Sequence, residues 1–332
     1  MEQIKTVRQV NEYDVLKSMA ILLVVLGHIT ILFTPESYPN ADTRLAQYIT
    51  FGIYLFHMPL FMVISGAVYQ LCKAKDKYNH FSLFVKNKLK RVIVPYFLIG
   101  FIVLLPALVL RYPDVCFFDS ETWLKILLAK DCRHLWYLLA LFWIFLLQYG
   151  ADCLKINLWV LLLITSAITL GLSVFAPDFK FFCLNMAFRK WPCFILGILL
   201  IKYQYRFSRN QMIIISMIGG VICSAIIYIS ENPYIDMIFS LLLPYFICIA
   251  LVALARNITL SGRSKALIRG ICSYSFGIYL FHVSAIYVIK HYIDSYLSIS
   301  AMITFMFIAS IAVSIALTAI LRKVKLGIMI GE

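Results

Sequence analysis

The sequence has little charge for its length. Only 14% of its 332 residues are charged, whereas 62% are hydrophobic, and the mean hydropathy is +0.89. A soluble protein of this size would need more charge on its surface. The composition therefore argues against a soluble protein and predicts an all-α, polytopic membrane helix bundle. We therefore explain the net charge of +14 first by the orientation of the protein in the membrane, and we predict no nucleic-acid partner.

Other signals are missing too. No small-residue cleavage site follows the first apolar run, so we expect that run to be retained as a helix. No internal repeat is visible, so the matching halves of many transporters do not show. The nine cysteines are an odd number and most lie in apolar runs, which argues against a disulfide framework. The sequence leaves room for one bridge among Cys116, Cys132 and Cys183, in predicted outer loops.

Ten apolar spans can be drawn along the chain, although the sixth is short and Trp191-Pro192 interrupts its start. They are 15–34, 48–71, 91–110, 134–150, 156–176, 190–203, 211–230, 235–255, 272–289 and 298–321. An even number of crossings places both termini on one side. With the amino terminus inside, 21 of the 30 Lys and Arg residues fall on the inner side. Cytoplasmic loops carry this excess of positive charge, so we predict about ten transmembrane helices with both termini cytoplasmic.

The first predicted helix carries an unusual stripe of polar residues. Lys17 and His28 are 11 residues apart, which is about three helical turns, so they share one face about 16 Å apart. Asp14 lies one turn before Lys17 on the same side. The stripe thus joins a charged entrance to a histidine about halfway across the membrane. Such groups are costly in lipid and usually mark a functional site.

His28, His57 and His282 lie near the middle of their predicted spans. A single buried histidine is more often a packed, hydrogen-bonded residue than a catalyst. Three at similar depth favour a shared polar cavity, and the histidine pKa suits proton transfer near neutral pH. Metal binding is the rival interpretation. No Asp or Glu lies beside these histidines at mid-depth, and no pair has ligand spacing, so we predict no metal.

Two further stretches could line such a cavity. Ser275, Tyr279 and His282 follow an i, i+4, i+7 stripe, which indicates either a site or a polar seam between helices. In the second span, Pro59 predicts a kink and Ser65-Gly66 a close helix approach near the cytosolic side.

The inner loop 72–90 is strongly basic. It would bind anionic membrane lipid or receive a polyanionic cytosolic ligand such as a nucleotide. In the outer loop 111–133, the run Trp123–Leu128 is too short to span, so we expect an interfacial helix over the outer mouth.

Several motifs occur in a recognisable order. They are Asp14-x-x-Lys17-x10-His28, Leu60-Phe61-Met62-Val63-Ile64-Ser65-Gly66, the basic run Lys88–Arg91 ahead of Pro95, His134-Leu135-Trp136-Tyr137, and Tyr274-Ser-x-Gly-Ile-Tyr-Leu-x-His282. Together they resemble the integral-membrane acyltransferase-3 family, which transfers acyl groups, usually acetyl, to sugars of surface polysaccharides. The string His57-Met-Pro-Leu-Phe61 is most similar to the fucose-4-O-acetylase-like branch.

The sequence departs from the family pattern in three ways. Lys17 stands where the family has Arg, which keeps the charge but loses the planar guanidinium. Lys88-x-x-Arg91 stands where the family has Arg-x-x-Arg. The extracytoplasmic domain fused to some members is not expected, so residues 1–332 are interpreted as one integral-membrane domain.

The resemblance implies acetyl-CoA as the cytosolic donor, a glycan or lipid-linked sugar as the acceptor, and a bacterial plasma membrane as the location. His28 would act as general base or transient acyl carrier, with Lys17 and Asp14 beside it. His282 and Tyr279 would orient the acceptor or stabilise an oxyanion. The remaining candidates are Lys86, Lys88, Lys90, Arg91 and Ser65 for the donor, and His57, Trp136 and His134, at the outer mouth, for the acceptor.

Two other functions fit the same sequence. A ten-helix bundle with a polar interior would also serve as an exporter or flippase of polysaccharide or lipid-linked sugar. An inactive member with a scaffolding role in glycan assembly is the third interpretation. Binding of acetyl-CoA, or release of CoA when a glycan acceptor is added, separates an acyltransferase from an exporter or flippase.

Overall fold

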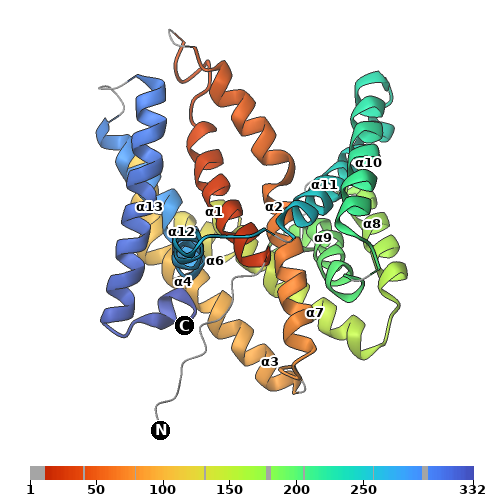
Figure 1. Ribbon diagram of the computed structural model, residues 1–332. Coiled ribbons are helices and arrows are strands. Elements are labelled where there is room, and N and C mark those ends of the chain that lie inside the picture. The colour runs from red at the N-terminus through yellow and green to blue at the C-terminus, as the bar shows by residue number, and fades with distance from the viewer. Residues whose placement is uncertain are drawn as a thin grey trace.

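The computed structural model describes residues 12–39, 42–78, 80–130, 132–176, 181–204, 206–256, 258–293 and 298–332, and every regular element in these ranges is a helix. Within them, ten helical segments are long and apolar enough to cross a membrane. This confirms the predicted all-α, multi-pass bundle. Figure 1 shows α1 (Glu12–Thr30) and α2 (Arg44–Lys73) between two flanks, with α12 and α13 on one side and α8 and α10 on the other.

The other elements follow in chain order. They are α3 (Phe81–Lys88), η1 (Leu89–Ile93), α4 (Val94–Ile99), η2 (Gly100–Leu104), α5 (Leu105–Arg111), α6 (Ser120–Leu127), η3 (Arg133–Leu135), α7 (Trp136–Cys153), α8 (Leu158–Phe175), α9 (Leu184–Lys202), α10 (Arg209–Ile229), α11 (Pro233–Ala255), α12 (Gly262–Ile293), α13 (Ile299–Lys323) and η4 (Gly327–Ile330).

Three predicted span starts were wrong by six residues or more. The third span begins at Phe81 and the ninth at Gly262, both about ten residues earlier than expected, because their polar first turns do not register as membrane-spanning. The sixth, α9, begins at Leu184 and contains Pro192 in its interior. A proline inside a membrane helix is tolerated where neighbouring helices pack around it, and Trp191 and Pro192 are both buried. The Trp-Pro pair therefore does not mark a helix start.

The third span is interrupted by two π-helical turns, η1 and η2. A proline follows each turn by two residues, at Pro95 and Pro106. Proline has no N–H to donate to the preceding turn, and a widened turn absorbs the missing bond. The first widened turn contains Lys90 and Arg91, which the sequence alone placed at a regular helix start.

Helices α2 and α9 form the most extensive contact among the described elements. At their crossing, a Cβ on Gly66 would lie 1.9 Å from the carbonyl oxygen of Phe194, and one on Gly197 would lie 2.0 Å from that of Val63. Both backbones therefore touch directly, as the predicted Ser65-Gly66 approach required.

A polar network secures the neighbouring helix α7 to this pair. The carboxylate of Asp152 accepts a hydrogen bond from Tyr69 of α2 at 2.8 Å and forms an ion pair with Lys73 at 2.9 Å. Gln148 donates to Asp152 at 3.2 Å and accepts from the indole of Trp191 in α9 at 3.0 Å. Polar groups buried among helices need such partners, so this network fixes the relative position of α2, α7 and α9.

The short helix α6 confirms the predicted helix at Trp123–Leu128, with Asp119 capping its amino terminus. It packs on the third span, where the hydroxyl of Tyr96 donates to the carbonyl oxygen of Ile126 at 2.6 Å and Trp123 stacks on Phe101.

We predict that Gly197→Ala destabilises the protein, whereas Gly171→Ala does not. Both substitutions place alanine in a helix, but only the first forces a Cβ against a neighbouring backbone; a Cβ on Gly171 meets nothing within 4 Å. Overpacking of this kind costs about 1–3 kcal/mol, while Gly to Ala in an open helix is neutral or stabilising. Melting temperatures in detergent measure the difference. Equal stability of both variants would contradict the crossing described above.

Candidate active site

Two cavities lie end to end between α1, α2, α7 and α12. We name them inner and outer after the predicted orientation of α1. The inner cavity, of about 210 Å³, reaches Lys17 and Lys88. The outer cavity, of about 470 Å³, contains His28, His57 and His134. Val24, Met58 and Tyr279 line both, so these three side chains form the partition between them. The predicted stripe on α1 is present, since Lys17, Val24 and His28 lead from one cavity into the other.

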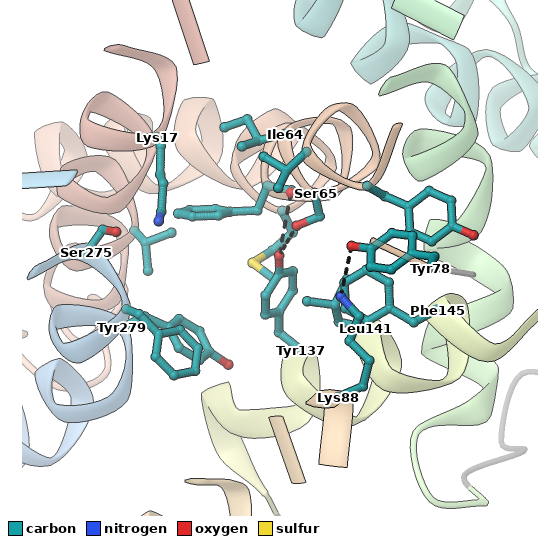
Figure 2. A pocket seen from close by; sticks show the side chains of 16 residues that line it. Lys17, Ile64, Ser65, Tyr78, Lys88, Tyr137, Leu141, Phe145, Ser275 and Tyr279 are labelled. Atoms are coloured by element: carbon teal, nitrogen blue, oxygen red, sulfur yellow. Dashed lines mark hydrogen bonds between the residues drawn. The ribbon is translucent and has the colours of Figure 1, made fainter. Parts of the chain in front are cut away.

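The inner cavity is aromatic with two ammonium groups (Figure 2). Lys17 extends from α1 toward Ser275 of α12, and Lys88 enters from the opposite side. Between them, the hydroxyls of Ser65 and Tyr137 form a hydrogen bond of 2.8 Å. The cavity thus combines positive charge with apolar walls, which suits a long, thin ligand carrying a polarised group.

Lys88 is held by aromatic rings. Its Nζ donates to the hydroxyl of Tyr78 at 3.4 Å and lies 3.6 Å from the centre of the Phe145 ring. Burial raises the pKa of Tyr78 well above its usual range, so the phenol stays neutral. The ammonium therefore faces π-electrons and a neutral hydroxyl, and its charge is available to an anionic ligand.

The other predicted donor-binding cations lie elsewhere. Lys86, Lys90 and Arg91 are exposed at the surface and do not line the inner cavity, whereas Lys88 is half-buried and does. The structure therefore separates one cavity lysine from three surface cations that the sequence placed together.

Three imidazole rings meet at the inner end of the outer cavity. The ring centre of His282 lies 5.1 Å from that of His28 and 5.0 Å from that of His134, and His28 and His134 are 6.4 Å apart. His134 was predicted at the outer mouth, but it is 4% exposed and lies within this cluster. His57 lines the same cavity, and its ring packs on Tyr54 at 4.7 Å.

Backbone contacts assign the protons on three of these rings. A carbonyl oxygen only accepts, so the ring nitrogen that contacts it carries the hydrogen. Nδ1 of His57 contacts Ile53, Nδ1 of His282 contacts Ile278, and Nε2 of His134 contacts Leu280. In their neutral forms these rings therefore present an acceptor nitrogen at the other position.

Two of these acceptors are buried without a partner among the described groups: Nε2 of His282 and Nδ1 of His134. Buried polar atoms usually have a hydrogen-bond partner, so both are poised to accept one from a ligand or from His28. For His28 itself, the structure gives no hydrogen bond to any described protein group. The ring of His28 is thus the least engaged in hydrogen bonds to the described groups among the cluster, and it lines the outer cavity.

Tyr279 spans the partition and supports the cluster. Its hydroxyl donates to the backbone carbonyl of His134 at 2.5 Å, and its ring lies against His134. Because this hydroxyl has one hydrogen, it is not free to stabilise an oxyanion in the same arrangement. The geometry makes Tyr279 a residue that positions His134, while Ser275 of the same stripe lines the inner cavity.

Asp14 lines neither cavity. It is buried, and its Oδ1 accepts a hydrogen bond from the thiol of Cys272 in α12 at 3.5 Å. This contact joins α1 to α12 at the start of the stripe. The predicted pairing of Asp14 with Lys17 stays a prediction, since Lys17 points into the inner cavity (Figure 2).

The outer cavity contains residues that sequence reasoning missed. Trp136 was expected there and does line it, but so do Tyr54, Lys190 and Ser240. Lys190 is in α9 and is the first residue of the predicted span 190–203. A basic residue inside a predicted membrane helix was the available signal. It adds a cation to a cavity already lined by aromatic rings, a combination suited to sugars.

The histidine cluster does not resemble a metal centre. Among the described residues, no group of three or more His, Cys, Asp or Glu side chains is arranged to hold a metal ion. The rings pack edge to face or tilted, which suits mutual packing and hydrogen bonding better than convergence on one ion.

Comparison with known proteins gives a family match. The model of a family described as an acyltransferase domain matches residues 10–319. The nodulation protein NolL of Sinorhizobium fredii (strain NBRC 101917 / NGR234) is 46% identical over 54 residues, which are 16% of this chain and 14% of that protein. This chain thus covers a small part of that relative. No solved structure matches the present chain.

We predict that the two cavities open to opposite sides of the membrane. Ser65→Cys places a thiol in the inner cavity and Ser240→Cys one in the outer cavity, in a background where the exposed Cys116 and Cys153 are serine. A small membrane-impermeant thiosulfonate should modify the first only in inside-out vesicles and the second only in right-side-out vesicles. Modification of both from one face would refute this arrangement.

Proposed function

Because the chain belongs to the acyltransferase family whose model matches it nearly end to end, we propose that it is a membrane O-acyltransferase. It moves an acyl group, in the first instance acetyl, from cytosolic acetyl-CoA to a hydroxyl of a cell-surface or lipid-linked glycan in a bacterial plasma membrane. The observation that carries this proposal is the pair of cavities that meet at Val24, Met58 and Tyr279, with the least committed histidine, His28, beside the partition.

The inner cavity suits the reactive end of the donor. It is too small for a nucleotide, but the pantetheine arm is thin and apolar along most of its length. The thioester would then lie at the partition, beside Val24 and Tyr279, with Lys17 next to the pantetheine arm. The phosphates of the nucleotide would stay at the exposed Lys86, Lys90 and Arg91. Lys88 stands between these two zones and would contact the innermost phosphate or an amide of the arm.

The outer cavity suits the acceptor. Tyr54 and Trp136 offer aromatic faces, and His57, Ser240 and Lys190 offer polar groups for sugar hydroxyls or an acidic substituent. A hydroxyl directed at the partition would donate its hydrogen to the ring of His28. The acceptor sugar enters from the side opposite the donor, so each substrate has its own route to the same point.

The chemistry then requires one proton to move twice. His28 takes the proton from the acceptor hydroxyl as its oxygen attacks the thioester carbonyl. The C–S bond breaks, the ester forms, and the coenzyme thiolate receives the proton back from His28. The acceptor nitrogens of His282 and His134 are placed to stabilise the imidazolium form of His28 between these steps. A route through a transient acyl-histidine would use the same ring as nucleophile.

We predict that His28→Ala lowers acetyl transfer by about 10²–10⁴-fold, the usual contribution of a positioned general base. The variant should still fold, because His28 makes no hydrogen bond that holds the bundle together. The matched control is His291→Ala, which removes an exposed histidine from the last turn of α12. Release of O-acetyl groups from surface glycan measures activity. Full activity of His28→Ala would refute the assignment of His28 as the catalytic residue.

We also predict that Lys88→Met weakens donor binding more than Lys86→Met. Both changes remove one positive charge from α3, but only Lys88 lines the inner cavity. The KM for acetyl-CoA should rise about tenfold in Lys88→Met, equivalent to about 1.4 kcal/mol, with a smaller rise in Lys86→Met. An equal effect of the two changes would place the donor on the surface instead of in the cavity.

Direct donor binding separates this proposal from an exporter or flippase. A transporter of lipid-linked sugar would have no use for a thioester site. Purified protein that binds no acetyl-CoA at micromolar concentration, yet moves sugar across vesicles, would favour transport.

A further inference from the structure

Two cysteines that the proposed chemistry does not use lie together next to the histidine cluster. The Sγ atoms of Cys132 and Cys183 are 3.6 Å apart, although the residues are 51 positions apart in the chain. They are 6% and 5% exposed, respectively. We propose that Cys132 and Cys183 form a disulfide that ties the turn carrying His134 to the amino terminus of α9.

The backbone on both sides is shaped for a close approach. In the turn around Cys132, Ala129 and Arg133 have φ of 57° and 45°. In the other turn, Phe182 and Cys183 have φ of 44° and 57°. Residues other than glycine rarely adopt this left-handed conformation and keep it only where the surrounding structure enforces it. A covalent bond between the two turns is one means of enforcing it. The thiols need to approach by little more than 1.5 Å to reach bonding distance, which is about 2.05 Å.

The compartment is suitable for oxidation. Cys132 follows the third span and Cys183 follows the fifth, so successive crossings place both on the same side of the membrane. The basic segment 72–90 covers the end of the second span and the start of the third, and is therefore on the other side. Since basic loops face the cytoplasm, the two cysteines face the outer compartment, where disulfides form and persist.

The position of Cys183 favours it as the first thiol to react. It is the N-cap residue of α9, where the helix dipole favours a thiolate. The Cys183 thiolate attacks the disulfide of an extracytoplasmic thiol oxidoreductase and releases one thiolate of that protein. The thiolate of Cys132 then attacks Cys183 Sγ in the mixed disulfide. The bridge forms, and the oxidoreductase leaves as a dithiol with the two electrons.

Burial sets the order of events. Both thiols are covered in the folded protein, so the exchange takes place before the two turns pack. Afterwards the bridge is shielded from reductants. The bond would hold the loop that carries His134, whose backbone carbonyl oxygen accepts a hydrogen bond from Tyr279. It would link that loop to α9, which packs on α2. It therefore fixes one imidazole of the cluster relative to the helices that line the outer cavity.

The test counts thiols in the full-length protein. Membranes are denatured with an alkylating maleimide, with or without prior reduction, and intact-mass spectrometry counts the labels. The wild-type protein should carry two fewer labels without reductant than the nine cysteines allow. Cys132→Ser and Cys183→Ser should each abolish that difference, while Cys116→Ser, which removes an exposed cysteine, should preserve it. Labelling of all nine cysteines in unreduced wild-type protein overturns the proposal.

A second measurement concerns the consequence of the bond. The variant lacking both cysteines should melt about 5–10 °C lower than wild type, as expected for loss of a long-loop disulfide in a protein of this size. Wild-type protein denatured, reduced and refolded without oxidant should melt like the double variant. If the variants do not fold, the thiol count on wild-type protein still decides the matter. Because no acyl transfer is measured, the result is independent of the proposed function.

Discussion

The direct backbone contact between α2 and α9 is the constraint on which the rest of the structure depends. Gly66 and Gly197 leave no space for a Cβ, and the polar network around Asp152 then binds α7 to the same pair. Without a hydrophobic driving force between helices in lipid, such close packing and internal hydrogen bonds hold a bundle together. The crossing sets the separation between α2, with its cavity-lining residues, and α9, with Lys190. It thereby sets the width of the outer cavity, which residues of both helices line.

The site divides its polar groups between two compartments. Lys17 and Lys88 face the inner cavity, whereas the imidazole rings and the ammonium group of Lys190 face the outer one. A thin partition at Val24, Met58 and Tyr279 separates the two. This division suits a transfer between substrates that arrive from opposite sides, because each is recognised before they meet. It also limits access of water to the junction, where a thioester would otherwise be hydrolysed.

Much of this was predictable from local pattern. Apolar run length identified all ten crossings, and helical periodicity placed Lys17 and His28 on one stripe that the cavities follow. Predictions failed where the pattern was not local. His134 was expected at the mouth because it begins a span, yet a loop folds it back onto α12. Lys86, Lys88, Lys90 and Arg91 are indistinguishable as basic residues, and only packing shows that Lys88 turns inward.

The sequence by itself determined the class of the protein, the number of its spans and the face of α1 that carries the polar residues. These follow from the cost of charge in lipid and from the 3.6-residue repeat, both of which act on one helix at a time. The tertiary structure alone decided which imidazoles meet His28, where the partition lies and that Cys132 faces Cys183. Such pairings join residues far apart in the chain, and they depend on how helices cross, which no single helix specifies.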